Sequence, residues 1–386
     1  MTKPFNRLVD QVPPSGIRRF FDLVVGAQDV ISLGVGEPDF MTPWAIREDA
    51  IYSLEHGRVT YTENGGLLAC RQAVSTYLSD FFHAHYDPHT QIVMTIGVSE
   101  GVDLVLRSLL NPGNEVIIPE PAYVCYGPLV QLAGGRPVPI NTQSSGFIPT
   151  VAAIEAAITP ATTAIILCSP SNPTGRSIPK ERQAALLDLA KRHDLWVISD
   201  EVYAALSYDT PPVSMGSFSS YQDRVIVLNG FSKAFSMTGW RLGYVCGPPE
   251  LIKRVIKIHQ YCALCAPTVS QYAAIEGLKH AHKEVEKMRV SYLKRRNLVV
   301  HALQDMGLPT LVPEGAFYVF PSIEPTGLDA ETFALQLLEK EKVAVVPGTA
   351  FGLGGDGHIR CCYATDMSQL TEAMARMARF VKGVMS

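Results

Sequence analysis

Short apolar segments alternate with longer amphipathic ones through the first two thirds of the chain. The short segments have the length and the composition of strands that are buried on both faces of a sheet. In chain order they are Ile92–Ile96, Glu115–Pro119, Pro137–Ile140, Ala164–Cys168, Trp196–Ser199, Val225–Leu228 and Leu242–Cys246. Helices are expected between them, as at Gly101–Leu110, Val151–Ala157 and Glu181–His193. The pattern predicts an α/β fold in which a mostly parallel, seven-stranded sheet lies between helices.

The last hundred residues follow a different pattern. A long amphipathic helix, Glu284–Met306, precedes strand-like pieces and a closing helix, Met367–Lys382. The strand-like pieces are Ala316–Pro321, Ala344–Pro347 and His358–Tyr363. This order is typical of a smaller α+β domain.

A chain of 386 residues is longer than one ordinary core, so we expect two domains. The predicted division has three parts. Residues 1–45 form an N-terminal arm and part of the small domain, residues 46–285 the large domain, and residues 286–386 the small C-terminal domain.

Composition and charge narrow the class of protein. Hydrophobic residues make up 47% and charged residues 18%, and a net charge of −4 gives no reason to expect nucleic acid or an anionic membrane as a partner. The first ten residues lack the apolar core of a signal peptide, and no apolar run approaches membrane-spanning length. We therefore expect a cytoplasmic protein.

The eight cysteines are interpreted as free structural thiols in a reducing compartment. Cys262 and Cys265 have the spacing of a redox or zinc motif, but no second cysteine pair at zinc-ligand spacing accompanies them. No metal site is predicted.

Polar motifs directly follow four of the predicted strands. They are Gly97–Gly101, Ser171-Asn172, Asp200 and Ser232-Lys233. Ligands of open α/β sheets bind beyond the carboxyl ends of the strands, so these motifs indicate one shared site.

The segment Asn229–Tyr244, NGFSKAFSMTGWRLGY, carries the most specific chemistry. Lys233 follows an apolar strand among small and hydroxyl residues, which makes it a candidate covalent nucleophile. Arg241 lies eight positions later, and a phosphate-sized anion could sit between its guanidinium and Ser232.

Several motifs together resemble the class I pyridoxal-phosphate aminotransferases of fold type I, in the family's order and over nearly the whole chain. They are LGVGEPDF at 33–40, TYTENGG at 60–66, SNPTG at 171–175, SDEVY at 199–203, SKAFSMTGWRLG at 232–243, PEGAFY at 313–318 and PGTAFG at 347–352. The resemblance implies a transaminase with pyridoxal 5'-phosphate as cofactor. It also implies a homodimer with shared active sites, in which Tyr61 reaches the phosphate of the neighbouring subunit.

The resemblance assigns the catalytic roles. Lys233 would form the Schiff base with the cofactor and move the proton between substrate and cofactor. Asp200, which ends a buried strand, would pair with the pyridinium nitrogen, although a helix N-cap is the alternative. Tyr203 and Asn172 would donate to the phenolate oxygen, although Asn172 also suits a turn.

The remaining cofactor contacts lie around the phosphate and the ring. The backbone of Gly97–Gly101, including Val98, Ser99 and Glu100, would cradle the phosphate together with Ser232 and Arg241, unless Ser99 only caps the helix. Tyr123 could stack on the pyridine face or simply pack in the core. Gly230 stands where many relatives carry a phosphate-binding serine, and Val98-Ser99-Glu100 differs from the commoner cradles.

The substrate contacts are expected at Gly36, Asn172, Arg360 and Ile17. Arg360 lies in an apolar segment, and its planar fork matches an α-carboxylate, with a structural ion pair as the alternative. The segment Ser15–Leu23 resembles the γ subgroup of prokaryotic aspartate and aromatic aminotransferases, in which it folds over the substrate. There Ile17 would favour apolar side chains, while Arg18 or Arg19 could attract a dicarboxylate or form an exposed helix face.

We therefore expect a ping-pong aminotransferase that works through a Lys233 aldimine. It would move nitrogen from an aromatic amino acid or aspartate to 2-oxoglutarate. Two alternatives stay open, a carbon–sulfur β-lyase with the same lysine and a catalytically inactive binding or regulatory protein on the same fold. A nucleotide-binding oxidoreductase is disfavoured because Asp39 occupies the third glycine position after Gly34-Val-Gly36.

Overall fold

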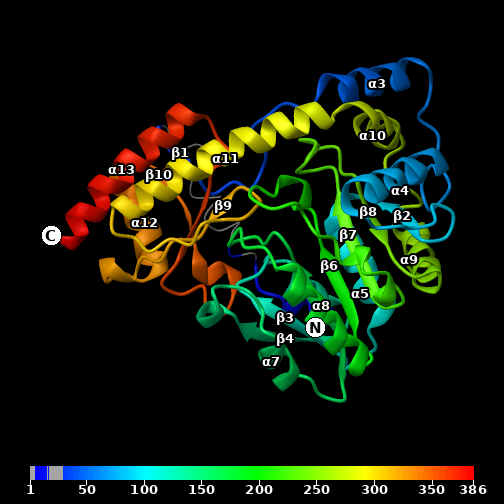
Figure 1. The fold of residues 1–386 in the computed structure, drawn as a ribbon, viewed down its shortest axis with the longest axis horizontal. Helices are drawn as coiled ribbons and strands as arrows, with labels where there is room; N and C mark the ends of the chain where they lie inside the picture. The colour runs from blue at the N-terminus through cyan, green and yellow to red at the C-terminus, as the bar shows by residue number, and fades with distance from the viewer. Residues whose placement is uncertain (1–4, 15, 17–28) are drawn as a thin grey trace.

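The computed structural model describes residues 5–14, 16 and 29–386, and Figure 1 gives the arrangement of the elements. Its largest sheet has seven strands in the order β2-β8-β7-β6-β5-β3-β4. The strands are β2 (Ile92–Thr95), β3 (Glu115–Glu120), β4 (Arg136–Asn141), β5 (Thr162–Cys168), β6 (Trp196–Asp200), β7 (Val225–Gly230) and β8 (Gly243–Cys246). Only β8 runs antiparallel to its neighbours, so the predicted mostly parallel sheet is confirmed.

Six of the seven strands contribute to two apolar cores, because successive side chains point to opposite faces, whereas the edge strand β4 packs against only one of them. In β7, Val225 and Val227 join one core, while Ile226 and Leu228 join the other. The first core is covered by α4 (Leu68–Phe82), α8 (Lys180–Arg192) and α10 (Thr268–His280). The second is covered by α5 (Gly97–Leu109), α6 (Tyr126–Leu132) and α9 (Pro249–Cys262). Burial on both faces explains why these strands are apolar without alternation.

The C-terminal part of the chain packs around a separate core. It contains α11 (His282–Asp305), α12 (Ala330–Glu341) and α13 (Met367–Met385), with the antiparallel sheet β11-β12-β9. These strands are β9 (Tyr318–Val319), β11 (Val346–Pro347) and β12 (Ile359–Cys362). In Figure 1, α11 runs from the side of α10 to the side of α13 and so links the two regions.

The N-terminal segment contributes to this second region. β1 (Ile31–Ser32) pairs in parallel with β10 (Val343–Ala344), and Leu33 is buried in the core formed by α11 to α13. The predicted domain boundaries at residues 45 and 285 stay a prediction. Among the described residues, the other α-helices are α1 (Arg7–Gln11), α3 (Trp44–Glu55) and α7 (Val151–Ala156).

Several predicted boundaries were wrong. The helix expected at Gly101–Leu110 begins at Gly97, since Gly97 has a φ of +72° and turns the chain directly from β2 into α5. The strand expected at Ala316–Pro321 is only Tyr318–Val319, because Ala316 has a φ of +60° and Pro321 has no N–H to donate. The piece expected at Ala344–Pro347 is divided between β10 and β11, which belong to different sheets.

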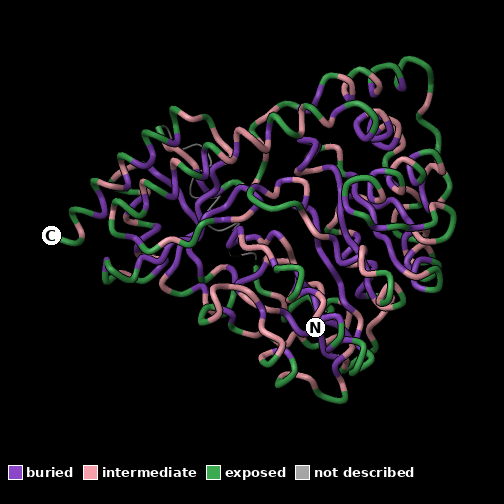
Figure 2. The backbone as a smooth tube through the Cα atoms, viewed as in Figure 1, coloured by how far each residue is buried: buried purple, intermediate pink, exposed green. Residues whose placement is uncertain are grey.

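Burial follows these layers, as Figure 2 shows, with buried backbone along the strands and exposed backbone on the outer helix faces. All eight cysteines lie in the described part of the chain and are free thiols. Among the described residues, no helix is both long and apolar enough to cross a membrane.

Candidate active site

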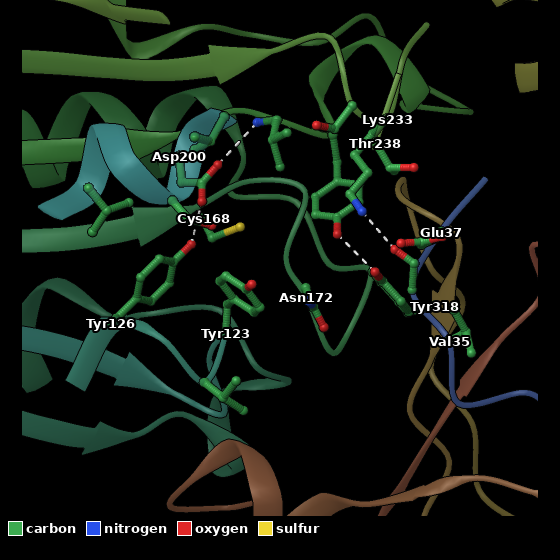
Figure 3. A pocket seen from close by; sticks show the side chains of 18 of the residues that line it. Val35, Glu37, Tyr123, Tyr126, Cys168, Asn172, Asp200, Lys233, Thr238 and Tyr318 are labelled. Atoms are coloured by element: carbon green, nitrogen blue, oxygen red, sulfur yellow. Dashed lines mark hydrogen bonds between the residues drawn. The ribbon is translucent and has the colours of Figure 1, made fainter. Parts of the chain in front are cut away.

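A cavity of about 1170 Å³ lies between the carboxyl ends of the seven-stranded sheet and the three-stranded sheet. It brings together most of the predicted site residues. Those that line it are Gly36, Val98, Ser99, Tyr123, Asn172, Asp200, Tyr203, Ser232, Lys233, Arg241 and Arg360. Figure 3 shows Asp200 and Tyr126 toward one end of the cavity, with Lys233 and Tyr318 toward the other.

Lys233 stands just beyond the end of β7. Its Nζ donates to the backbone oxygen of Gly36 at 2.6 Å. The side chain reaches the cavity but is otherwise enclosed, and its pKa is lowered to about 8, mainly by burial and also by Arg360 and Arg241, while Cys362 and Glu37 oppose the shift. A substantial fraction of the amine is therefore neutral near pH 8, as a nucleophile or base requires.

Asp200 is the last residue of β6 and is buried. The hydroxyl of Tyr126 donates to its Oδ2 at 2.6 Å, and the N–H of Val202 donates to its Oδ1 at 3.2 Å. Burial raises the pKa of the carboxyl, while both hydrogen bonds and the charge of Lys233 oppose that rise. A cationic ring nitrogen in the cavity would supply the close countercharge that a buried carboxylate needs.

The backbone at the start of α5 forms a tight cradle against Arg241. A Cβ on Gly97 would lie 2.6 Å from Nη2 of Arg241, so only glycine allows this approach. Arg241 has a φ of +51° and its Nη1 donates to the backbone oxygen of Thr238 at 3.0 Å. Helix N–H groups and a guanidinium together make a site for a phosphate group.

The side chains of Glu100 and Tyr61 do not line this cavity, but Glu100 was predicted to contribute its backbone N–H and Tyr61 to reach the neighbouring subunit, so both stay predictions. The carboxylate of Glu100 accepts from the N–H of Ile96 at 2.5 Å and lies 3.1 Å from Nδ1 of His259, so its side chain does not line the cavity. Tyr61 is 80% exposed and does not line the cavity of its own chain. Ile17, Arg18 and Arg19 lie outside the described residues.

Arg360 approaches the cavity from the middle of β12 and is buried. Its Nη1 donates to Oδ1 of Asn172 at 2.9 Å, and its Nη2 donates to the backbone oxygen of Gly34 at 2.5 Å. Its Nε has no hydrogen-bond partner among the described residues. A fixed, buried guanidinium with an open donor is suited to bind a substrate carboxylate.

Other lining residues were not predicted from the sequence, and Tyr126, Tyr318 and Glu37 are among them. Tyr126 lies only three positions after Tyr123, and the buried Asp200 already required a partner, so a signal existed. Tyr318 was quoted within a motif without a role. Its hydroxyl lies 2.8 Å from that of Tyr203, a contact between distant segments that no local pattern predicts.

The side chains and backbone groups of this cavity fit pyridoxal phosphate. The cradle of α5 with Arg241 suits its phosphate, Asp200 suits its ring nitrogen, and the partly neutral Lys233 suits its aldehyde. Tyr123 lines the same cavity and offers an aromatic face.

Comparisons with known proteins agree with this arrangement. The family model for aminotransferase class I and II matches residues 28–377. A Bacillus subtilis protein, YugH, whose name assigns it to the aminotransferases without naming a substrate, is 50% identical over 99% of both chains. An aromatic-amino-acid aminotransferase of Thermococcus litoralis is 42% identical over 97% of both chains. The solved aspartate aminotransferase of Thermus thermophilus with maleate has a TM-score of 0.93 at 35% identity, covering 98% of this chain and 100% of the other.

The chain therefore belongs to the family of class I and II aminotransferases. It is a pyridoxal-phosphate-dependent transaminase of fold type I, acting on amino acids and 2-oxo acids. The expectation of an enzyme with this cofactor is confirmed, and the inactive binding protein is no longer needed as an alternative.

Proposed function

We propose that the enzyme transfers the amino group of an aromatic L-amino acid to 2-oxoglutarate by a ping-pong mechanism. The observation that carries this choice is the character of the cavity wall. Val35, Val124 and Pro14 line it. An aromatic side chain would bury its area against these apolar groups.

The cations of the described wall already have other assignments. Arg241 belongs to the phosphate cradle, Lys233 to the reacting centre and Arg360 to the α-carboxylate. The second carboxylate of 2-oxoglutarate would need a further cation in the return half-reaction, as would that of aspartate or glutamate, and Arg18 or Arg19 could supply it. Among the relatives, the Thermococcus litoralis enzyme is named for aromatic amino acids and the Thermus thermophilus enzyme for aspartate.

The residues divide the work of one half-reaction. When bound, pyridoxal phosphate supplies an electron sink for the pair left on the substrate α-carbon. Arg360, oriented by Asn172 and Gly34, would hold the α-carboxylate and fix the α-carbon near Lys233. The Nζ of Lys233 would take the proton from the substrate α-carbon and deliver it to C4′ of the cofactor. Asp200 would keep the ring nitrogen protonated.

We also propose that the enzyme is a homodimer. Large apolar side chains are exposed on α3 and on the segments beside α10, where α3 and α10 pack together at one end of the molecule (Figure 1). They are Met41, Trp44, Ile51, Leu54, Val59, Tyr61, Tyr261 and Leu264. Exposed apolar side chains gathered on neighbouring elements are typical of a subunit interface, and pairing two copies there would let Tyr61 enter the partner's cavity.

The dimer is tested by placing charges on this surface. We expect Trp44→Glu with Leu54→Glu to give monomers in size-exclusion chromatography with light scattering, and to weaken cofactor binding because the site loses Tyr61. Leu335→Glu, a similarly exposed leucine on α12, serves as the control and should leave the dimer intact. Monomers from the unaltered protein at micromolar concentration would contradict the proposal.

A cytoplasmic location is proposed as well, since eight free thiols suit a reducing compartment. Fractionation of the native cell, followed by thiol labelling, tests it.

The substrate is tested by single-turnover absorbance. The purified holoenzyme is mixed separately with Phe, Tyr, Trp, Asp, Glu, Lys, Ala and cystathionine, and loss of the cofactor's visible band is timed. We expect aromatic amino acids and Glu to react fastest. If Asp reacts fastest, the enzyme is an aspartate aminotransferase, and if cystathionine releases pyruvate, the β-lyase alternative replaces the proposal.

A further inference from the structure

Tyr318 occupies a junction between the two ends of the cavity. It lies in β9 and is 1% exposed. Its hydroxyl is 2.8 Å from the hydroxyl of Tyr203, and the two rings meet nearly edge to face at an interplanar angle of 80°. Its ring centroid is 4.6 Å from the guanidinium carbon of Arg360. Tyr318 therefore contacts both Tyr203, which is predicted to bind the cofactor, and Arg360, which is predicted to bind the substrate carboxylate.

The position of the Tyr318 hydroxyl is tightly fixed. A Cβ on Gly36 would collide with it, so the glycine leaves the space that the hydroxyl fills. Tyr203 comes from the segment after β6, whereas Tyr318 is paired within the three-stranded sheet through Cys362. The two hydroxyls are therefore held by different parts of the fold, the segment after β6 and the three-stranded sheet, and their contact depends on how these parts meet.

The chemistry of two phenols sets the direction of donation. Each hydroxyl has one proton to give and two lone pairs to accept with. Burial raises the pKa of Tyr203 and the pKa of Tyr318 well above the usual value, so both keep their protons at working pH. When the hydroxyl of Tyr203 donates its hydrogen bond to an acceptor in the cavity, it can only accept a hydrogen bond from Tyr318.

We propose that Tyr318 is a positioning residue that donates to Tyr203 and so orients and strengthens the hydrogen bond from Tyr203 to the cofactor's phenolic oxygen. The inference rests on the assignment of Tyr203 to that oxygen. Hydrogen bonds in a chain polarise one another, so the second donor strengthens the first. The ring of Tyr318 has a separate task, which is to pack against Arg360.

The hydroxyl and the ring can be separated by substitution. Tyr318→Phe removes the hydroxyl and keeps the ring on Arg360. A donor to the phenolic oxygen stabilises its negative charge, which is fullest when the linked lysine nitrogen has lost its proton. Losing that donation therefore raises the apparent pKa of the bound cofactor's visible band.

The main test is a spectroscopic pH titration of the holoenzyme. For Tyr318→Phe we expect the apparent pKa of the band to rise by roughly 0.5 to 1 pH unit, with kcat reduced a few-fold and KM for the amino acid unchanged. Tyr203→Phe should give a larger rise. The double variant should match Tyr203→Phe alone, because Tyr318 acts through Tyr203.

A second measurement keeps the test independent of turnover. Isothermal titration of the apoenzyme with 4'-deoxypyridoxine 5'-phosphate, which has the phenolic oxygen but no aldehyde, should show several-fold weaker binding for Tyr318→Phe. Tyr363→Phe is the matched control, since Tyr363 is fully buried, bonds Tyr208 at 3.3 Å and does not line the cavity. It should leave both readouts unchanged.

The outcomes distinguish the role of Tyr318 from the role of Tyr203. A shift for Tyr203→Phe without one for Tyr318→Phe overturns the role of Tyr318 alone, as would additive shifts in the double variant. No shift for Tyr203→Phe overturns the proposal at its premise. The order of substrate preference is untouched by either result, so failure of the proposed aromatic specificity is seen separately.

Discussion

The two sheets contribute to the active site in different ways. The seven-stranded sheet supplies residues at or just beyond strand ends, as with Asp200 at the end of β6 and Lys233 after β7. The three-stranded sheet supplies residues from within short strands, Arg360 in β12 and Tyr318 in β9. A strand-end residue is aimed by the edge of a sheet, whereas a mid-strand residue is aimed by register and by the pleat.

The difference separates reaction from recognition. The seven-stranded sheet provides the groups expected to act on the cofactor, and its rim is fixed by strands buried on both faces. The three-stranded sheet provides the groups expected to hold the substrate carboxylate, and it belongs to a separate core. Changes at Asp200 or Lys233 should therefore alter kcat, and changes at Arg360 should alter substrate capture. The hydroxyl of Tyr318 is the exception on the second side, because it acts on the first group through Tyr203.

The largest effect is expected at the strand end of β7. Lys233→Ala removes the amine that takes the α-proton, so kcat should fall by about 1000-fold or more, and the band of the covalently held cofactor should vanish. Steady-state kinetics and absorbance spectra measure this. Lys253→Ala, an exposed lysine on α9, is the control. A variant that kept the band would break the assignment of the whole strand-end group.

The second effect concerns the three-stranded sheet. Arg360→Lys loses the planar fork and leaves Asn172 and Gly34 poorly paired, so kcat/KM should fall by about 100-fold for all amino acids alike. The loss should appear mainly in KM. Arg296→Lys is the control, because Arg296 is equally buried but pairs with Asp209 outside the cavity. A loss confined to kcat would erase the distinction between the two sheets.

A third prediction concerns the free energy of unfolding that is lost by burying the carboxyl of Glu201, the residue directly after β6. Glu201 is 2% exposed, its Oε1 accepts from Ser199 and from the N–H of Met215, and its Oε2 has no partner among the described residues. Burial raises its pKa to about 7. The folded state thus keeps a proton that the unfolded chain releases above about pH 4.5, so this group lowers stability progressively as pH rises toward 7.

Glu201→Gln should remove that cost. The variant should be more stable than the unaltered protein by about 2 kcal/mol above pH 7, with the difference disappearing near pH 4.5. Melting temperatures measured across this pH range test the expectation. Glu181→Gln, an exposed carboxylate in α8, should show no pH-dependent difference. A constant difference at all pH values would mean that packing, not ionisation, accounts for the change.

The smallest effect is expected at Tyr126, whose hydroxyl donates to Asp200. Tyr126→Phe removes the 2.6 Å hydrogen bond that helps keep the carboxyl ionised, so the pKa of Asp200 should rise further. We expect kcat to fall by about 5-fold, with the acid limb of the pH profile shifted upward and KM unchanged. Tyr77→Phe, buried away from the cavity, is the comparison. An equal loss at every pH would indicate distorted packing instead.

The same contrast explains what the sequence could predict. Asp200 and Lys233 were recognisable because each follows an apolar run, and the order of such runs predicts a shared sheet edge. Arg360 was recognisable because a charge within an apolar segment needs an anion. Tyr318 was not recognisable, since a buried tyrosine is interpreted as a core residue until its hydroxyl partner is known, and Tyr126 was indicated only by its spacing from Tyr123 and by the partner that Asp200 requires. The side-chain direction of Glu100 depended on His259, which is 159 positions away.

The left-handed backbone of Arg241 has a consequence outside the reaction. A non-glycine residue at a φ of +51° costs on the order of 1 kcal/mol, and here that conformation places a guanidinium beside the start of α5, where the phosphate is predicted to bind. Cofactor bound at 100 times its Kd adds about 2.7 kcal/mol to the stability of the folded chain. In a cell short of pyridoxal phosphate, newly made chains would stay longer without cofactor, and this less stable form is degraded more readily by proteases. The abundance of this enzyme should therefore track the supply of its cofactor.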